Sequence, residues 1–138
     1  MKKLACVICI PAAIYRRHVI VFFGASIDEI IAYGVKNRIG RASFSLEWVE
    51  IAQQAAGKNA GFCLDYGEGN GDILVWVRKY PKTAAEFGIL YHELYHAVEC
   101  VASAVDPIRR LVDEDGHSEA RANLFEYLVT EVNRVLWK

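Results

Sequence analysis

The sequence predicts one domain of the α+β class. Its 138 residues suit a single domain over residues 1–138, and its hydrophobic fraction of 54% is enough to build a core. Runs rich in β-branched and aromatic residues predict strands in the first part of the chain, and two long helical patterns follow them. We therefore expect a small, mostly antiparallel sheet packed on two C-terminal helices.

The charge of the chain is nearly balanced. The formal net charge is −1 and the pI is about 6.4. Binding to nucleic acid or to an anionic membrane surface depends on an excess of basic residues, so we expect no nucleic acid and no membrane as partner. No run of about eighteen apolar residues occurs, so no membrane-spanning helix is expected. The sequence does not fix the oligomeric state.

The N-terminal segment has some features of an export signal. Lys2 and Lys3 precede an apolar run over residues 4–14. No small-residue cleavage site follows this run, and two arginines and a second apolar run come next. We therefore expect this segment to belong to the fold and the protein to be cytoplasmic, with an export signal as the alternative.

A strand and two helices are predicted next. Residues 18–23 (HVIVFF) end at Gly24 and are typical of a strand. Ser26 and Asp28 open a helix that ends by Gly40, and a second helix is expected over residues 45–56. The inward-facing residues are expected to be Ile27, Ile30, Ile31 and Val35 in the first helix and Leu46, Val49, Ile51 and Ala52 in the second.

A β-hairpin is predicted by residues 62–66 and 72–80, which flank the glycine-rich loop 67–71. The loop lacks the lysine and hydroxyl residue of a phosphate-binding loop, so we interpret it as a turn. Alternation divides the second strand into two faces, with Ile73, Val75 and Val77 on one and Leu74, Trp76, Arg78 and Tyr80 on the other.

Two helices are expected to complete the chain. The first begins with the capping-box pattern of residues 83–86 (TAAE) and runs to about residue 104, where Asp106-Pro107 stops it. The second begins near residue 115 or 118 and continues to the C-terminus. The apolar positions of both helices are expected to pack on the sheet.

The four cysteines are few and scattered, so a disulfide framework is not expected. Cys6 and Cys9 have the spacing of a metal-binding or redox pair. A structural zinc site would need a second such pair or a histidine pair nearby, and neither is visible. We interpret the two cysteines as small apolar residues of a buried segment.

The central motif is His92-Glu93-Leu94-Tyr95-His96. On a helix, residues four apart lie on one face, so both imidazoles can bind the same metal ion. Glu93 is close enough to act as general base on a water molecule at that ion. The alternative is a helix that exposes polar residues. Two histidines on one helix favour zinc, although iron(II) uses similar ligands.

A catalytic zinc site usually takes a third protein ligand. Glu119 lies 23 positions after His96 (119 − 96), near the start of the final helix, and is our candidate. Asp115 is the main rival, followed by Asp113 and Glu114. The alternative for Glu119 is a solvated acid favoured by the helix dipole.

Two further residues near Glu119 have candidate roles. Asn123 is one turn later and is expected to accept the outward N–H of a ligand histidine. His117 is a candidate for stabilising the transition state or for a fourth ligand, and a loop residue in solvent is the alternative.

The segments HELYHAVE and SEARANLFEYL resemble the gluzincin-type zincin metallopeptidases, and most of all small metallopeptidases encoded by phages and prophages. The resemblance covers residue 72 to the C-terminus, and residues 1–60 match only loosely. It implies a minimal zincin-like domain, with a small sheet over the HExxH helix and an edge strand beside the cleft. It also implies His92, His96 and Glu119 as zinc ligands and Glu93 as base.

We therefore expect a zinc-dependent metallopeptidase acting on a peptide or protein substrate. The strand over residues 72–80 is expected to bind an extended peptide, with Trp76 and Arg78 contacting it. One alternative is a catalytically weak or inactive, metal-stabilised interaction module of phage or prophage origin. Another is hydrolysis of an amide that is not a peptide.

Overall fold

Among the residues that it describes, the computed structural model has four helices and a four-stranded mixed sheet, which confirms the α+β class. The residues that it describes are 6–12, 15–39, 43–68, 71–103 and 114–138, with the side chains of residues 103 and 114–118 left out. The elements are β1 (Cys6–Ala12), β2 (Arg17–Phe23), α1 (Ile27–Asn37), α2 (Leu46–Lys58), β3 (Gly61–Asp65), β4 (Ile73–Val77), α3 (Ala84–Ser103) and α5 (Glu114–Leu136).

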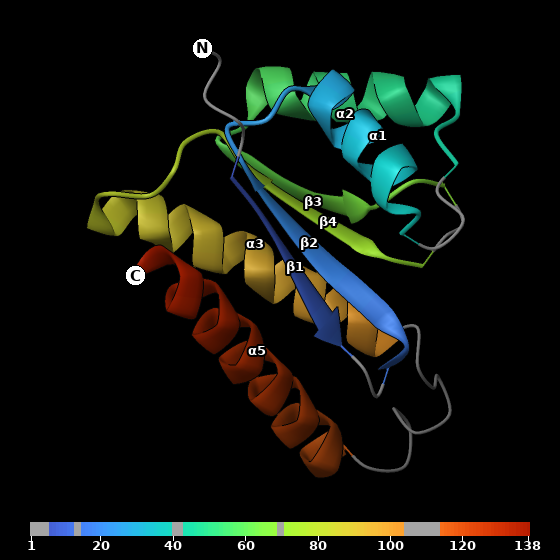
Figure 1. The fold of residues 1–138 in the computed structure, drawn as a ribbon. Helices are drawn as coiled ribbons and strands as arrows, with labels where there is room; N and C mark the ends of the chain where they lie inside the picture. The colour runs from blue at the N-terminus through green and yellow to red at the C-terminus, as the bar shows by residue number, and fades with distance from the viewer. Residues whose placement is uncertain (1–5, 13–14, 40–42, 69–70, 104–113) are drawn as a thin grey trace.

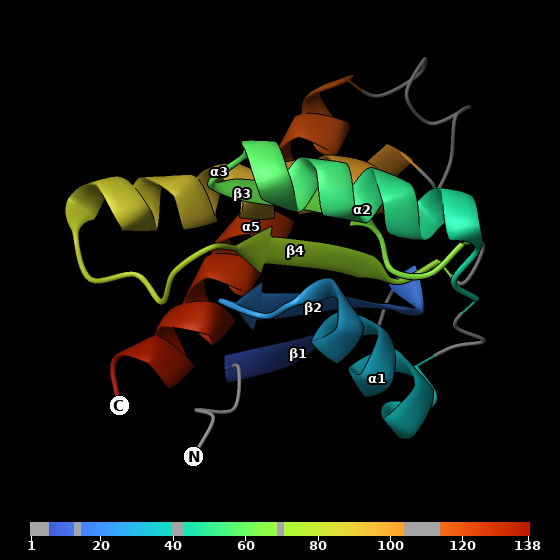
Figure 2. The ribbon, with the colours of Figure 1, turned by 90° about the horizontal axis from the view of Figure 1, so that it is seen from above.

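The strand order of the sheet is β1-β2-β4-β3, which leaves β1 and β3 at the two edges (Figure 2). β1 pairs with β2 and β3 pairs with β4 in antiparallel fashion, whereas β2 and β4 run parallel. The predicted hairpin is therefore confirmed as β3 and β4. The chain between β2 and β4 carries α1, α2 and β3, because parallel strands need a long crossover connection.

Helices cover both faces of the sheet (Figure 1). α3 and α5 lie under one face, and their apolar side chains meet those of alternate strand positions such as Val19, Val21 and Val75. α1 and α2 cover the other face, where the intervening positions Ile20, Phe22 and others point. The sequence predicted two layers, the sheet and the C-terminal helices. The structure has a third layer, formed by α1 and α2, whose position on the sheet was not predicted.

The layer under α1 and α2 is rich in aromatic side chains. Tyr66 stacks on Phe22 with ring centroids 5.8 Å apart, and its hydroxyl donates to the carbonyl of Ile30 in α1. Trp76 Nε1 donates to the Ala25 carbonyl at 2.8 Å. Buried polar groups therefore have partners in this layer, as burial requires.

Helices α1 and α2 begin where the sequence predicted. Ser26 forms a capping box with Glu29, and the Ser45 hydroxyl accepts a hydrogen bond from Trp48 N at 3.1 Å. The predicted inward faces were partly wrong. The residues that turn outward are Val35, Leu46 and Ile51, with exposed fractions of 66%, 77% and 47%.

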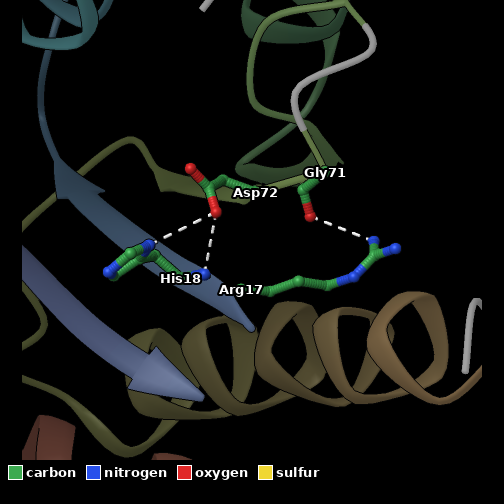
Figure 3. A network of polar contacts seen from close by, with 4 residues as sticks. All are labelled: Arg17, His18, Gly71 and Asp72. Atoms are coloured by element: carbon green, nitrogen blue, oxygen red, sulfur yellow. Dashed lines mark hydrogen bonds and ion pairs between the residues drawn. The ribbon is translucent and has the colours of Figure 1, made fainter. Parts of the chain in front are cut away.

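Polar contacts join the N-terminal ends of the parallel strands β2 and β4 (Figure 3). Asp72 is buried, and its Oδ1 accepts a hydrogen bond from His18 N at 2.9 Å and lies 3.4 Å from His18 Nδ1. Arg17 Nη1 donates to the Gly71 carbonyl at 3.0 Å. His18 thus has a structural role, because these contacts join the two strands at this register.

The N-terminal segment forms part of the fold from residue 6 onward, because β1 pairs with β2 along its length. Cys6 packs against the α3 and α5 side of the sheet, whereas Cys9 is exposed on the other side. Residues three apart on a strand point to opposite faces, so the two thiols do not converge on one ion. Within the described ranges, no helix has the length and hydrophobicity needed to cross a bilayer.

Candidate active site

Helix α3 carries the central motif and begins with a capped turn. Thr83 Oγ1 accepts a hydrogen bond from Glu86 N at 3.2 Å, and Glu86 Oε2 accepts one from Lys82 N at 3.0 Å. The predicted cap is present, with the Lys82 amide as the reciprocal donor. The residues of α3 that are fully buried beneath the sheet are Leu90, Leu94, Ala97, Val98 and Val101. This packing fixes the rotation of the helix about its axis.

The side chains of His92 and His96 lie side by side on the face of α3 next to its buried face. Their Nε2 atoms are 3.0 Å apart, and the ring planes cross at 82°. The prediction that the spacing of four residues brings the two rings together is confirmed. Two nitrogen ligands of one tetrahedral zinc ion, each about 2.0–2.1 Å from it, lie about 3.3 Å apart. The donor atoms and their separation therefore fit a shared metal ion.

Glu93 points toward the edge of the sheet and is only 8% exposed. Its Cγ packs against Gly61 of β3, where a Cβ atom would come within 3.0 Å of it. Burial raises the pKa of the Glu93 carboxyl above its usual range, and the two nearby histidines oppose this shift. A carboxylate with a raised pKa accepts a proton closer to neutral pH, which is what a general base requires.

A cleft of about 790 Å³ lies between α3 and the edge strand β3. One wall is formed by β3 and the two residues before it, and the other by α3. Its lining includes His92, Glu93 and His96 from α3 and Gly61, Phe62 and Cys63 from β3. The edge strand beside the cleft, which the family resemblance implied, is therefore present as β3.

The structure does not bring the predicted third ligand to the two histidines. Glu119 is exposed on α5 and is absent from the lining of the cleft. Among the side chains that the structure describes, no group of three histidine, cysteine, aspartate or glutamate residues is arranged to hold a metal ion. The side chains of Glu114, Asp115 and His117, and all of Asp113, lie outside the described residues.

Asn123 lies away from the cleft. It is exposed and lines a separate pocket of about 430 Å³ together with Pro11 of β1 and Tyr127 of α5. In this arrangement it does not accept a hydrogen bond from either motif histidine, because the pocket is formed by α5 and the β1 edge and not by α3. The predicted role of Asn123 as a partner of a ligand histidine is therefore not supported by its position.

The prediction that β4 binds an extended peptide was wrong. β4 is an inner strand, paired on both sides with β2 and β3, so its backbone has no open edge. Trp76 is only 4% exposed and faces the α1 and α2 layer. Arg78 is exposed, but its Nη2 donates to the carbonyls of Ala56 and Asn59. Neither residue lines the cleft.

The sequence analysis missed residues of both cleft walls. Cys100 lies four residues after His96 and eight after His92, so helical periodicity alone places it near the same face. Gly61 and Cys63 come from β3, and no local pattern indicates that this strand borders α3. Comparison of the chain with protein-family models, curated proteins and solved structures found no match.

Proposed function

We propose that this chain is a zinc-dependent metallopeptidase, with His92 and His96 as metal ligands and Glu93 as general base. The observation that carries the proposal is the 3.0 Å separation of the two histidine Nε2 atoms at a cleft that also contains Glu93. The pair of imidazoles supplies two of the three protein ligands that a catalytic zinc ion usually takes, and the buried carboxylate beside them supplies the base.

Glu93 moves the proton in the proposed reaction. A zinc ion, when bound, supplies a Lewis acid that lowers the pKa of water and polarises a carbonyl group. The Glu93 carboxylate accepts a proton from the attacking water and then donates it to the amine nitrogen that leaves. Its low exposure of 8% keeps the carboxylate in a poorly hydrated position beside β3, where its raised pKa suits both transfers.

We propose that the substrate binds as an extended peptide along β3. This strand pairs with β4 on one side only, and residues from its start line the cleft. A peptide added to an exposed strand edge gains main-chain hydrogen bonds without a deep side-chain pocket. The inferred substrate is therefore an unfolded or extended segment of a protein.

Zinc content tests the ligands. We expect about one zinc ion per chain in reconstituted wild-type protein and a large loss in His92→Ala and His96→Ala. His18→Gln serves as the matched histidine control, because His18 lies on the other face of the sheet beside Asp72. Absence of zinc from the wild type after reconstitution would refute the proposal.

The third ligand is tested separately. Weaker zinc binding in Glu119→Ala than in Glu126→Ala, which removes another exposed acid from α5, would show that Glu119 acts as the third ligand despite its exposed position. Full occupancy in Glu119→Ala, together with loss in His96→Ala, would move the third ligand to residues 113–115 or to His117.

The rival function is a metal-stabilised interaction module without catalysis. It uses the same histidine pair, and the described side chains supply no third donor that would distinguish the two functions. The rival predicts normal zinc binding and no hydrolysis of any peptide, with zinc removal lowering the melting temperature. Peptide hydrolysis that needs Glu93 would exclude it.

A further inference from the structure

A pair of thiols spans the same cleft. Cys63 lies on the edge strand β3, and its register partner is Val75, whose side chain belongs to the core on the α3 side. The Cys63 side chain therefore faces α3. Cys100 lies on α3, one turn after His96, and the two thiols line facing walls of the cleft, close enough for a hydrogen bond.

Both thiols are placed where a small solute can reach them. Each is partly buried against the core, and each lines the cleft of about 790 Å³. The other two cysteines, Cys6 and Cys9, lie on β1 at the opposite edge of the sheet. The chain thus offers two reference thiols that lie outside the cleft.

The hydrogen bond makes the two thiols chemically unequal. Donation from the Cys63 S–H lowers the pKa of Cys100 to about 7, and the same bond raises the pKa of Cys63. Of the two thiols, Cys100 is therefore the one that loses its proton first as the pH rises. The thiolate is the form of cysteine that reacts with electrophiles and oxidants.

We propose that Cys63 and Cys100 are a redox modification site, at which a peroxide converts the two thiols into a disulfide that ties β3 to α3 across the cleft. The geometry that supports it is the contact between the thiols across two elements and their shared exposure to the cleft. The proposal does not rest on metal binding or on peptide hydrolysis.

The reaction balances with hydrogen peroxide as oxidant. The Cys100 thiolate attacks one peroxide oxygen, the O–O bond breaks, and the departing hydroxide takes up a proton to give water and a sulfenic acid. The Cys63 sulfur then attacks the Cys100 sulfur, and a second water leaves with the Cys63 proton. Two thiols and one peroxide give one disulfide and two waters. In the product the two sulfur atoms lie about 2.05 Å apart.

Oxidation of the full chain tests the proposal. After treatment with hydrogen peroxide, we expect two of the four thiols to be lost and peptide mapping without reductant to recover Cys63 linked to Cys100. A phosphine reductant should restore both thiols. The disulfide closes a loop between residues 63 and 100, so we expect the melting temperature to rise by on the order of 10 °C.

Variants separate this pair from the other thiols. Cys6→Ser and Cys9→Ser should still form the disulfide, whereas Cys63→Ser should stop at a sulfenic acid on Cys100 that a dimedone probe captures. Linkage through Cys6 or Cys9, disulfides only between chains, or loss of thiols without any linked peptide would overturn the proposal. The mapping uses wild-type protein, so it stands even if a variant fails to fold.

Discussion

A Cβ atom placed on Gly61 of β3 would lie 3.0 Å from Cγ of Glu93 on α3. The same atom would lie 3.0 Å from the carbonyl oxygen of Trp76 and 3.1 Å from Cγ2 of Ile89. Real Cβ atoms rarely approach other heavy atoms so closely, because interiors are packed near van der Waals contact. Glycine at this position therefore lets the edge strand lie against the carboxylate side chain of the motif.

Gly61→Ala should destabilise the protein and displace Glu93. We expect a loss of about 1–3 kcal/mol in the free energy of unfolding, because the carbonyl of Trp76 belongs to backbone and cannot yield easily. Urea denaturation measures this change. Gly57→Ala is the control, since a Cβ atom there meets nothing within 4 Å and alanine favours the helix by roughly 0.5–1 kcal/mol. Equal effects of the two changes would contradict the packing argument.

Glu93→Gln should remove peptide hydrolysis while leaving zinc content unchanged. The amide keeps the size of the side chain but cannot accept the proton, so we expect the rate to fall about 10²–10⁴-fold. Hydrolysis of an unfolded protein substrate by zinc-loaded enzyme measures the effect. Glu126→Gln, an exposed change on α5, should retain full activity. An active Glu93→Gln protein would show that another group acts as base.

Tyr66→Phe should weaken the contact between the sheet and α1. The Tyr66 side chain is fully buried, and its hydroxyl donates to the Ile30 carbonyl. Removing this bond should lower the free energy of unfolding by about 1 kcal/mol. The measurement is thermal or urea unfolding beside Tyr80→Phe, whose side chain is 42% exposed and whose loss should have little effect. A larger effect at Tyr80 than at Tyr66 would count against this hydrogen bond.

Alkylation of Cys100 should depend on pH in a way that reports its hydrogen bond. Because the pKa of Cys100 is lowered to about 7, its reaction with iodoacetamide should accelerate as the pH rises through about 7. Cys9 should react only at higher pH, since its thiol, although the residue is exposed, is partly desolvated by its neighbours and lies near Asp72, and both effects raise its pKa. Mass spectrometry of each labelled peptide gives both profiles.

Substitutions of Cys63 test whether its thiol is the cause of the lowered pKa of Cys100. Cys63→Ala removes the donor, so the midpoint for Cys100 should move upward, toward the usual range of a thiol near 8.5. Cys63→Ser keeps a hydroxyl donor and should retain a lower midpoint than Cys63→Ala. Identical profiles in wild type and Cys63→Ala would mean that the hydrogen bond does not set the pKa.

The parts of the fold that depend on neighbouring residues were predictable from the sequence. The caps at Ser26, Ser45 and Thr83 act within one helical turn, and the β3–β4 hairpin is joined by a short loop. The histidine pair belongs to this group, because helical periodicity alone brings His92 and His96 together.

Contacts between distant segments were not predictable in the same way. The alternation of β4 made one face appear exposed, because nothing local indicates that α1 and α2 cover it. Gly34 lies in α1, and a Cβ atom there would lie 2.9 Å from the Tyr66 hydroxyl, a contact that no local pattern indicates. The site shows the same dependence on distant contacts. Gly61 and Cys63 lie beside α3 because β3 is at the edge of the sheet, and the order of the strands cannot be read from neighbouring residues.

The described lining of the cleft comes from one continuous stretch of chain, residues 59–100. A single hairpin and the helix after it therefore supply both walls, and the first two strands, α1, α2 and α5 support them from outside. Substitutions in the described supporting segments reach this lining through packing. In evolutionary terms, the site can be inherited as one unit while the surrounding layers diverge.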